Sequence, residues 1–182
     1  MSLPSRNLVP LIIALMFVGS LVAAPDAWAQ DKHKYFFKAP PGVSKYTQQQ
    51  VIDVGNVPGH QLRIYELHTK YTTEAPVYDG IKVVEAWAHG VSDYTNGSGR
   101  SMNYGTSLLE NGDKIFSTTE VLMHTVVGPD GSRKSRFNTV VTLTSGTGRF
   151  KGIRGTLRGT GATDFKTGTS DAQTEGEYWI EK

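Results

Sequence analysis

The chain has 182 residues, with 19 lysines and arginines against 17 aspartates and glutamates, which gives a net charge of +2. This even balance provides no basic surface for nucleic acid or an anionic membrane, so we expect neither as a partner. Cysteine is absent, which excludes disulfide bonds and thiolate chemistry.

Residues 1–29 have the pattern of an export signal. Arg6 gives a positive start, residues 8–24 form an apolar run, and the tripeptide AWA at the end presents the small residues that a signal peptidase reads. The alternative is an uncleaved membrane anchor, but a spanning helix needs about 20 apolar residues. We therefore predict a cleaved signal peptide, no membrane partner after cleavage, and a periplasmic or secreted location.

Residues 30–46 show no regular period and are interrupted by Pro40-Pro41-Gly42, so we expect an irregular lead-in segment there. The remainder, 47–182, has the length of one domain. It is rich in Thr, Val, Ile, Tyr and Gly and has no helical apolar stripe, which favours strands. Eight extended segments are predicted, at about 49–55, 60–72, 81–95, 100–110, 113–127, 134–144, 154–165 and 173–181.

Short turn signals separate these segments. Asn96-Gly97 and Asn111-Gly112 can adopt the positive φ angles of tight hairpins, and the PDG sequence at 129–131 suits a type I turn. Long strands joined by short turns favour a closed antiparallel barrel, because closure removes exposed edges. The predicted fold class is therefore all-β, as an eight-stranded closed antiparallel barrel, with a two-sheet sandwich as the alternative.

The glycine-rich sequence SGTGRFKGIRGTLRGTG at 145–161 resembles the late hairpin of the allene oxide cyclase and dirigent protein superfamily. The closing EGEYWIEK resembles the last strand of that group, in bacterial members more than in plant ones. The resemblance implies an eight-stranded barrel, often trimeric, whose lumen holds an apolar small molecule. It implies no cofactor and no metal, and no plant catalytic position can be aligned with this chain.

The residues of this motif also have a structural interpretation. Its glycines suit turns and close backbone approach, while Phe150 and Ile153 are expected to anchor the core. A phosphate-binding loop is excluded, because neither a Lys-Ser/Thr pair nor a helix follows.

Two similar patterns hold the catalytic candidates. EAWAH at 85–89 and EVLMH at 120–124 each place a glutamate four residues before a histidine. At about 3.3 Å per residue, the two ends of one pattern lie about 13 Å apart, so any acid–base pair must form across strands.

The face that these residues occupy depends on the hairpin registers. A two-residue Asn111-Gly112 turn would place Asn103 opposite Glu120. A three-residue turn at 97–99 would then bring both patterns to one face, whereas a two-residue turn at 96–97 would separate them. The first register predicts one lumen site, although the same residues could instead form a solvated face. The predicted catalytic residues are Glu85, Glu120, His89 and His124, and the predicted ligand-binding residues are Trp87, Asn103 and Phe116.

A metal site is a further alternative. His68, His89 and His124 could join nearby glutamates, but no two of these histidines have the close spacing of metal ligands. We therefore expect no metal.

Two functions remain open. The first is an exported barrel that binds a small apolar molecule in its lumen, with isomerisation, cyclisation or a dirigent-like role implied by the resemblance. A buried carboxylate could polarise such a ligand, and burial should raise the pKa of at least one glutamate. The second is a non-catalytic structural or interaction barrel that acts through its surface. An open apolar lumen would favour the first function, and a lumen filled with side chains would favour the second.

Overall fold

The computed structural model describes residues 31–164, 166 and 169–181. The predicted signal peptide lies outside the described residues. Within the described part of the chain, no helix is long and apolar enough to cross a membrane.

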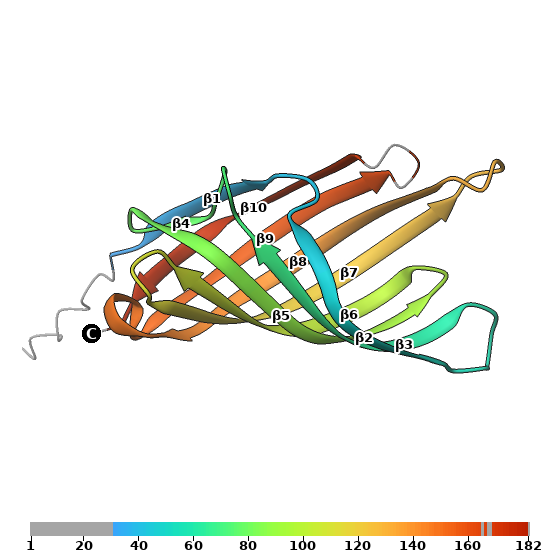
Figure 1. The fold of residues 1–182 in the computed structure, drawn as a ribbon, viewed down its shortest axis with the longest axis horizontal. Helices are drawn as coiled ribbons and strands as arrows, with labels where there is room; N and C mark the ends of the chain where they lie inside the picture. Colours follow the sequence, from blue (N-terminus) through green and yellow to red (C-terminus); the bar gives the residue numbers. More distant parts are fainter. Residues whose placement is uncertain (1–30, 165, 167–168, 182) are drawn as a thin grey trace, which may run out of the picture.

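The chain forms one antiparallel sheet of ten strands (Figure 1). The strands are β1 His33–Ala39, β2 Ser44–Asp53, β3 His60–Lys70, β4 Val77–Tyr78, β5 Ile81–Thr95, β6 Ser98–Leu109, β7 Lys114–Val127, β8 Arg133–Gly146, β9 Ile153–Asp164 and β10 Thr169–Ile180. A short 3-10 turn, η1 Gly148–Phe150, joins β8 to β9. All eight predicted segments are strands, because each combines β-forming residues with a turn signal at its end.

The sheet is not closed, so the prediction of a closed eight-stranded barrel is wrong. The strand order is β1-β10-β9-β8-β7-β6-β5-β3-β2, and the two outermost strands do not pair with each other. The Pro40-Pro41-Gly42 link, in which Gly42 has a φ of 75°, carries the chain from one sheet edge to the other. Proline cannot donate a ladder hydrogen bond, which disfavours a β1–β2 hairpin at this point.

The predicted irregular lead-in at 30–46 is also wrong. It contains β1, which pairs along its full length with β10, and the start of β2. The two-residue strand β4 was not predicted; it pairs with β5 and lies beside β1 at one end of the sheet (Figure 1).

Two hairpin registers determine the faces of the site residues: the first has the two-residue turn, one of the two lengths considered, and the second differs from prediction by one residue. Thr95 pairs with Ser98 around Asn96 and Gly97, whose φ angles are 51° and 83°, so this turn has two residues. At the next hairpin the Leu109 N–H donates to the Asp113 carbonyl, which leaves a three-residue loop at 110–112. Glu85 and Glu120 therefore share one face of the sheet, but through the longer loop at 110–112 and not through the three-residue turn at 97–99 on which the shared face was predicted to depend.

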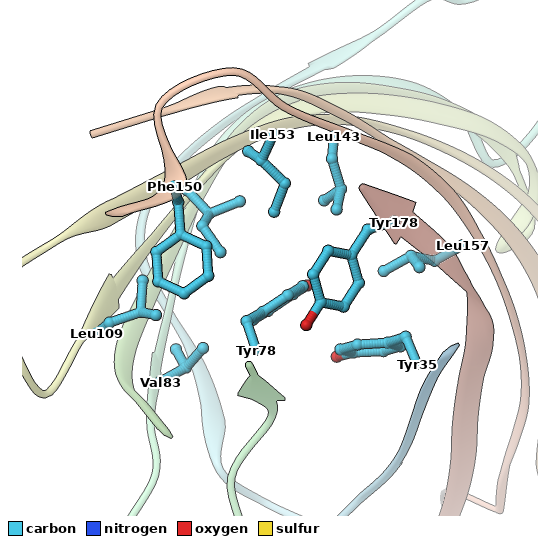
Figure 2. Close-up of a cluster of buried hydrophobic side chains, with 10 residues drawn as sticks. Tyr35, Tyr78, Val83, Leu109, Leu143, Phe150, Ile153, Leu157 and Tyr178 are labelled. Atoms are coloured by element: carbon cyan, nitrogen blue, oxygen red, sulfur yellow. The ribbon is translucent and has the colours of Figure 1, made fainter. Parts of the chain in front are cut away.

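The hydrophobic core occupies one end of one sheet face, which we call the core face (Figure 2). Phe150 and Ile153 are fully buried there, which confirms them as core anchors. Tyrosine rings from β1, β4 and β10 meet in the middle of the cluster and fill this end of the interior (Figure 2). The cluster consists of Tyr35, Tyr78, Val83, Leu109, Ile115, Leu143, Phe150, Ile153, Leu157 and Tyr178. We call the opposite side of the sheet the outer face.

Candidate functional site

Six of the seven predicted site residues lie on the outer face, so their predicted position in the lumen is wrong. Strand alternation and the pairing of β5, β6 and β7 define this face. The residues on it are Glu85, Trp87, His89, Phe116, Glu120 and His124. Asn103 lies alone on the core face, where it is 9% exposed and its Nδ2 donates to the Tyr65 hydroxyl at 3.4 Å.

An irregularity in β5 is the physical reason for this placement. The register shifts between Val83 and Glu85, so the strand contains a bulge there. Val83 is buried in the core, and without the bulge Glu85, two residues later, would face the same side. The bulge turns Glu85, and with it Trp87 and His89, to the outer face.

Histidine–carboxylate pairs connect β3 and β5 on this face. His68 Nε2 lies 3.1 Å from Glu85 Oε2, and the His68 ring stacks on Trp87 with ring centroids 5.0 Å apart. His89 Nε2 lies 2.9 Å from Glu66 Oε2. Each of the two glutamates therefore pairs with a histidine on the neighbouring strand, and Glu85 does not pair with His89 four residues along.

These contacts lower the pKa of both glutamates. The hydrogen bond from His68 is the largest cause for Glu85, with Lys70 adding a favourable charge. For Glu66 the hydrogen bond from the Thr47 hydroxyl is the largest cause, followed by that from His89. The pKa rise expected from burial is therefore wrong for Glu85, which is held as a carboxylate and is unsuited to act as a general acid.

Beside these pairs the outer face contains a hollow of about 950 Å³, which we call the outer groove. Aliphatic side chains from six adjacent strands form most of its wall. They are Ile52 on β2, Leu62 and Ile64 on β3, Val91 on β5, Met102 on β6, Leu122 on β7 and Val140 on β8.

The aliphatic side chains of the outer groove are unusually open to solvent. Ile64 is 60% exposed, Leu122 54% and Val91 49%. Single exposed aliphatic residues are common, but a contiguous apolar patch of this extent marks a binding surface.

Of the predicted residues, only Glu120 lines the outer groove. Its carboxylate has no hydrogen bond or ion pair with any residue that the structure describes. His89 lies at the border: its pair with Glu66 is the next pair on the outer face after Ile64 and Val91, two residues along each strand. His124 lies further along β7, beyond Leu122, while Trp87 and Phe116 are not part of the wall. The predicted residues therefore do not converge on one catalytic centre.

Sequence reasoning missed the aliphatic wall itself. The missed signal is that the middle of β7 carries apolar residues on both faces, with Val121 and Leu122 in succession. A strand of an open sheet with a solvated outer face should alternate apolar and polar residues instead.

The described residues contain no group of three or more histidine, aspartate or glutamate side chains arranged to hold a metal ion.

No protein-family model matches this chain. No curated protein matches it either. Among solved structures, a pterocarpan synthase dirigent protein is similar, with 18% sequence identity and a TM-score of 0.37. That match covers 83% of this chain and 95% of the other chain. A superposition of this quality transfers no residue role to the present chain.

Proposed function

We propose that this protein is an exported binding protein that takes a small apolar molecule in the outer groove. The observation that carries the proposal is the unbroken aliphatic wall, built from six adjacent strands around a hollow of about 950 Å³. Ligand sites commonly measure about 300–1,000 Å³ and combine an apolar lining with a few polar groups. The family resemblance implies the same class of ligand, but in the lumen, whereas the outer groove lies on the opposite face of the sheet.

The polar groups near the outer groove favour binding over catalysis. Acid–base catalysis needs a donor and an acceptor within reach of the same ligand atoms. His68 and His89 are already paired with Glu85 and Glu66, and of the four predicted catalytic residues only Glu120 lines the groove. Catalysis by Glu85, Glu120, His89 and His124 therefore stays a prediction, and a bound ligand need not be transformed.

The test is binding of N-phenyl-1-naphthylamine, an uncharged apolar fluorophore whose emission rises in apolar surroundings. We expect saturable binding to the wild type and a loss of at least several-fold in affinity for the double variant Val91→Thr, Met102→Gln. The matched control is Val126→Thr. Val126 is 56% exposed on the outer face of β7 but does not line the groove, so affinity should be unchanged. Absence of saturable binding, or an equal loss in the control, would contradict the proposal.

A second function is favoured by the high exposure of the same aliphatic side chains. A surface this open also suits docking of a macromolecule, including another copy of the chain. The homo-oligomer implied by the family resemblance is therefore kept as an alternative proposal. Sedimentation velocity over a hundredfold range of protein concentration separates the two functions, because self-association through the groove would compete with the fluorophore.

A further inference from the structure

The outer groove consists of two parallel rows of side chains that run across the strands. Neighbours within each row are direct cross-strand partners, so the rows follow from the register of the sheet. The first row is Ile52, Leu62, Asp93, Arg100, Leu122 and Asn138. The second row is Gln50, Ile64, Val91, Met102, Glu120 and Val140.

The rows make the groove long and narrow. Six strands have five gaps between them, and a strand spacing of about 4.8 Å gives a length of about 24 Å. The two rows are two residues apart along each strand, which corresponds to about 7 Å. This shape suits an unbranched chain lying across the strands better than a compact ring system.

An apolar path runs through the groove without interruption. From Ile64 and Val91 it passes to Met102 within the second row. Leu122 is the diagonal neighbour of Met102 on the next strand, and Val140 is the diagonal neighbour of Leu122. Diagonal neighbours are close enough for long side chains to touch, so the path continues to β8.

The polar groups of the groove favour an uncharged ligand. Its two ends carry the neutral amides of Gln50 and Asn138. Arg100 and Glu120 lie on adjacent strands in different rows, so one positive and one negative charge flank the middle of the path. Asp93 is engaged by His60, whose Nε2 lies 2.7 Å from its carboxylate. A charged head group of either sign would lie close to a like charge as well as an opposite one, whereas a neutral head group avoids this repulsion.

We propose that the ligand of the outer groove is an uncharged, unbranched long-chain molecule of the long-chain alcohol class, extended across the strands. This inference rests on the proposed function, because it specifies the ligand of the same groove.

The experiment is displacement of N-phenyl-1-naphthylamine by 1-hexanol, 1-octanol, 1-decanol and 1-dodecanol. Each buried methylene contributes about 0.8 kcal/mol, so affinity should increase about fourfold per carbon through the whole series. Cyclododecanol is the matched control, since it carries the same number of carbons and the same hydroxyl group in a compact ring. It should bind at least about tenfold more weakly than 1-dodecanol, because a ring contacts fewer of the aliphatic side chains along the path.

Equal binding of the ring and the chain, or a plateau after 1-octanol, would overturn the inference while leaving the proposed function intact. Fluorophore binding that no alcohol displaces would also overturn the inference and leave the proposed function intact. Failure of the fluorophore itself to bind would overturn the proposed function.

The same substitution at two positions tests where the alkyl chain of the ligand lies. Val91→Thr, at the centre of the path, should weaken 1-dodecanol by about fourfold, the equivalent of one methylene. Val126→Thr should leave its affinity unchanged. An equal effect of the two substitutions would overturn the placement of the ligand's alkyl chain in the groove. The thermal unfolding midpoint of each variant is measured to check that both variants are folded.

Discussion

Gly90 shows how a single residue sets the spacing between β3, β5 and β6. A Cβ atom at this position would lie 2.5 Å from the Met102 carbonyl oxygen, 2.7 Å from Asn103 Cβ and 2.8 Å from Tyr65 Cζ. Tyr65 is buried across this glycine on the core face. The backbone carbonyl cannot move without shifting the β5–β6 pairing that carries the groove.

We therefore predict that Gly90→Ala destabilises the protein by about 1–3 kcal/mol, the usual cost of overpacking. Gly105→Ala is the control, because its Cβ would meet only the Ser117 hydroxyl oxygen at 2.5 Å, and a hydroxyl can rotate away. The control should change the free energy of unfolding by less than about 0.5 kcal/mol. Urea denaturation measures both, and equal effects would show that the close contact at Gly90 is relieved by a small backbone movement.

The histidine–glutamate pairs predict how stability depends on pH. The pKa values of Glu66 and Glu85 are lowered in the folded protein from a reference value of 4.5. Their contribution is therefore complete above about pH 4.5 and is lost as the pH falls through the lower folded-state values.

We predict that the double variant Glu66→Gln, Glu85→Gln loses less stability between pH 5 and pH 3 than the wild type. Glu120→Gln is a control on the same face, since Glu120 has no partner among the described residues, and should follow the wild-type curve. Thermal unfolding midpoints across this range provide the measurement. If the midpoints of the double variant and the wild type fell in parallel with pH, this would contradict the hydrogen bonds assigned to Glu66 and Glu85.

At the scale of elements, the turn after the short strand β4 is tied to β10 by a hydrogen bond between distant parts of the chain, in addition to the packing of Tyr78 in the core. The Asp79 N–H donates to the Tyr178 hydroxyl oxygen at 2.7 Å, and Asp79 has a φ of 47° in the turn after β4. Tyr178 itself is 2% exposed, so its hydroxyl has little access to water.

Tyr178→Phe should therefore destabilise the protein by about 1–3 kcal/mol, because it leaves the Asp79 N–H without its partner. Tyr104→Phe removes a hydroxyl from a residue that is 61% exposed, and should cost less than about 0.5 kcal/mol. Chemical denaturation tests the pair. Equal stability of the two variants would indicate that water replaces the Tyr178 hydroxyl.

The elements also show what could be predicted from sequence. The eight long strands were recovered because hairpin signals such as Asn96-Gly97 separate them. Strand β1 was missed because Pro40 and Pro41 obscure it, and its partner β10 is distant in sequence. Of the predicted site residues only Glu120 lines the outer groove, and it was predicted to face the lumen. The face of a strand residue depends on turn length and on the bulge before Glu85, which has no clear sequence signal.

At the scale of the whole molecule, the core and the open sheet edge lie in different parts of the fold. Strand β9 lies inside the sheet between β10 and β8 and alternates buried residues with more exposed ones over most of its length, whereas every residue of the edge strand β2 is exposed. Few buried contacts correspond to low local stability.

Hydrogen–deuterium exchange should therefore be fastest in peptides from β2 and slowest in peptides from β9. Exchange at two protein concentrations serves as the control for self-association. Protection of β2 equal to that of β9 at the lower concentration would show that another part of the chain covers this edge.

The central claim is that the outer face of the sheet, opposite the core, binds the ligand. Methyl NMR spectra recorded during titration with N-phenyl-1-naphthylamine test it most directly, because the aromatic rings shift nearby methyl signals. The predicted result is saturable shifts at Ile64, Val91 and Leu122 in the outer groove, with Val83 and Leu157 in the core unchanged. Shifts confined to the core-face methyls would contradict the claim and return the site to the interior of the sheet.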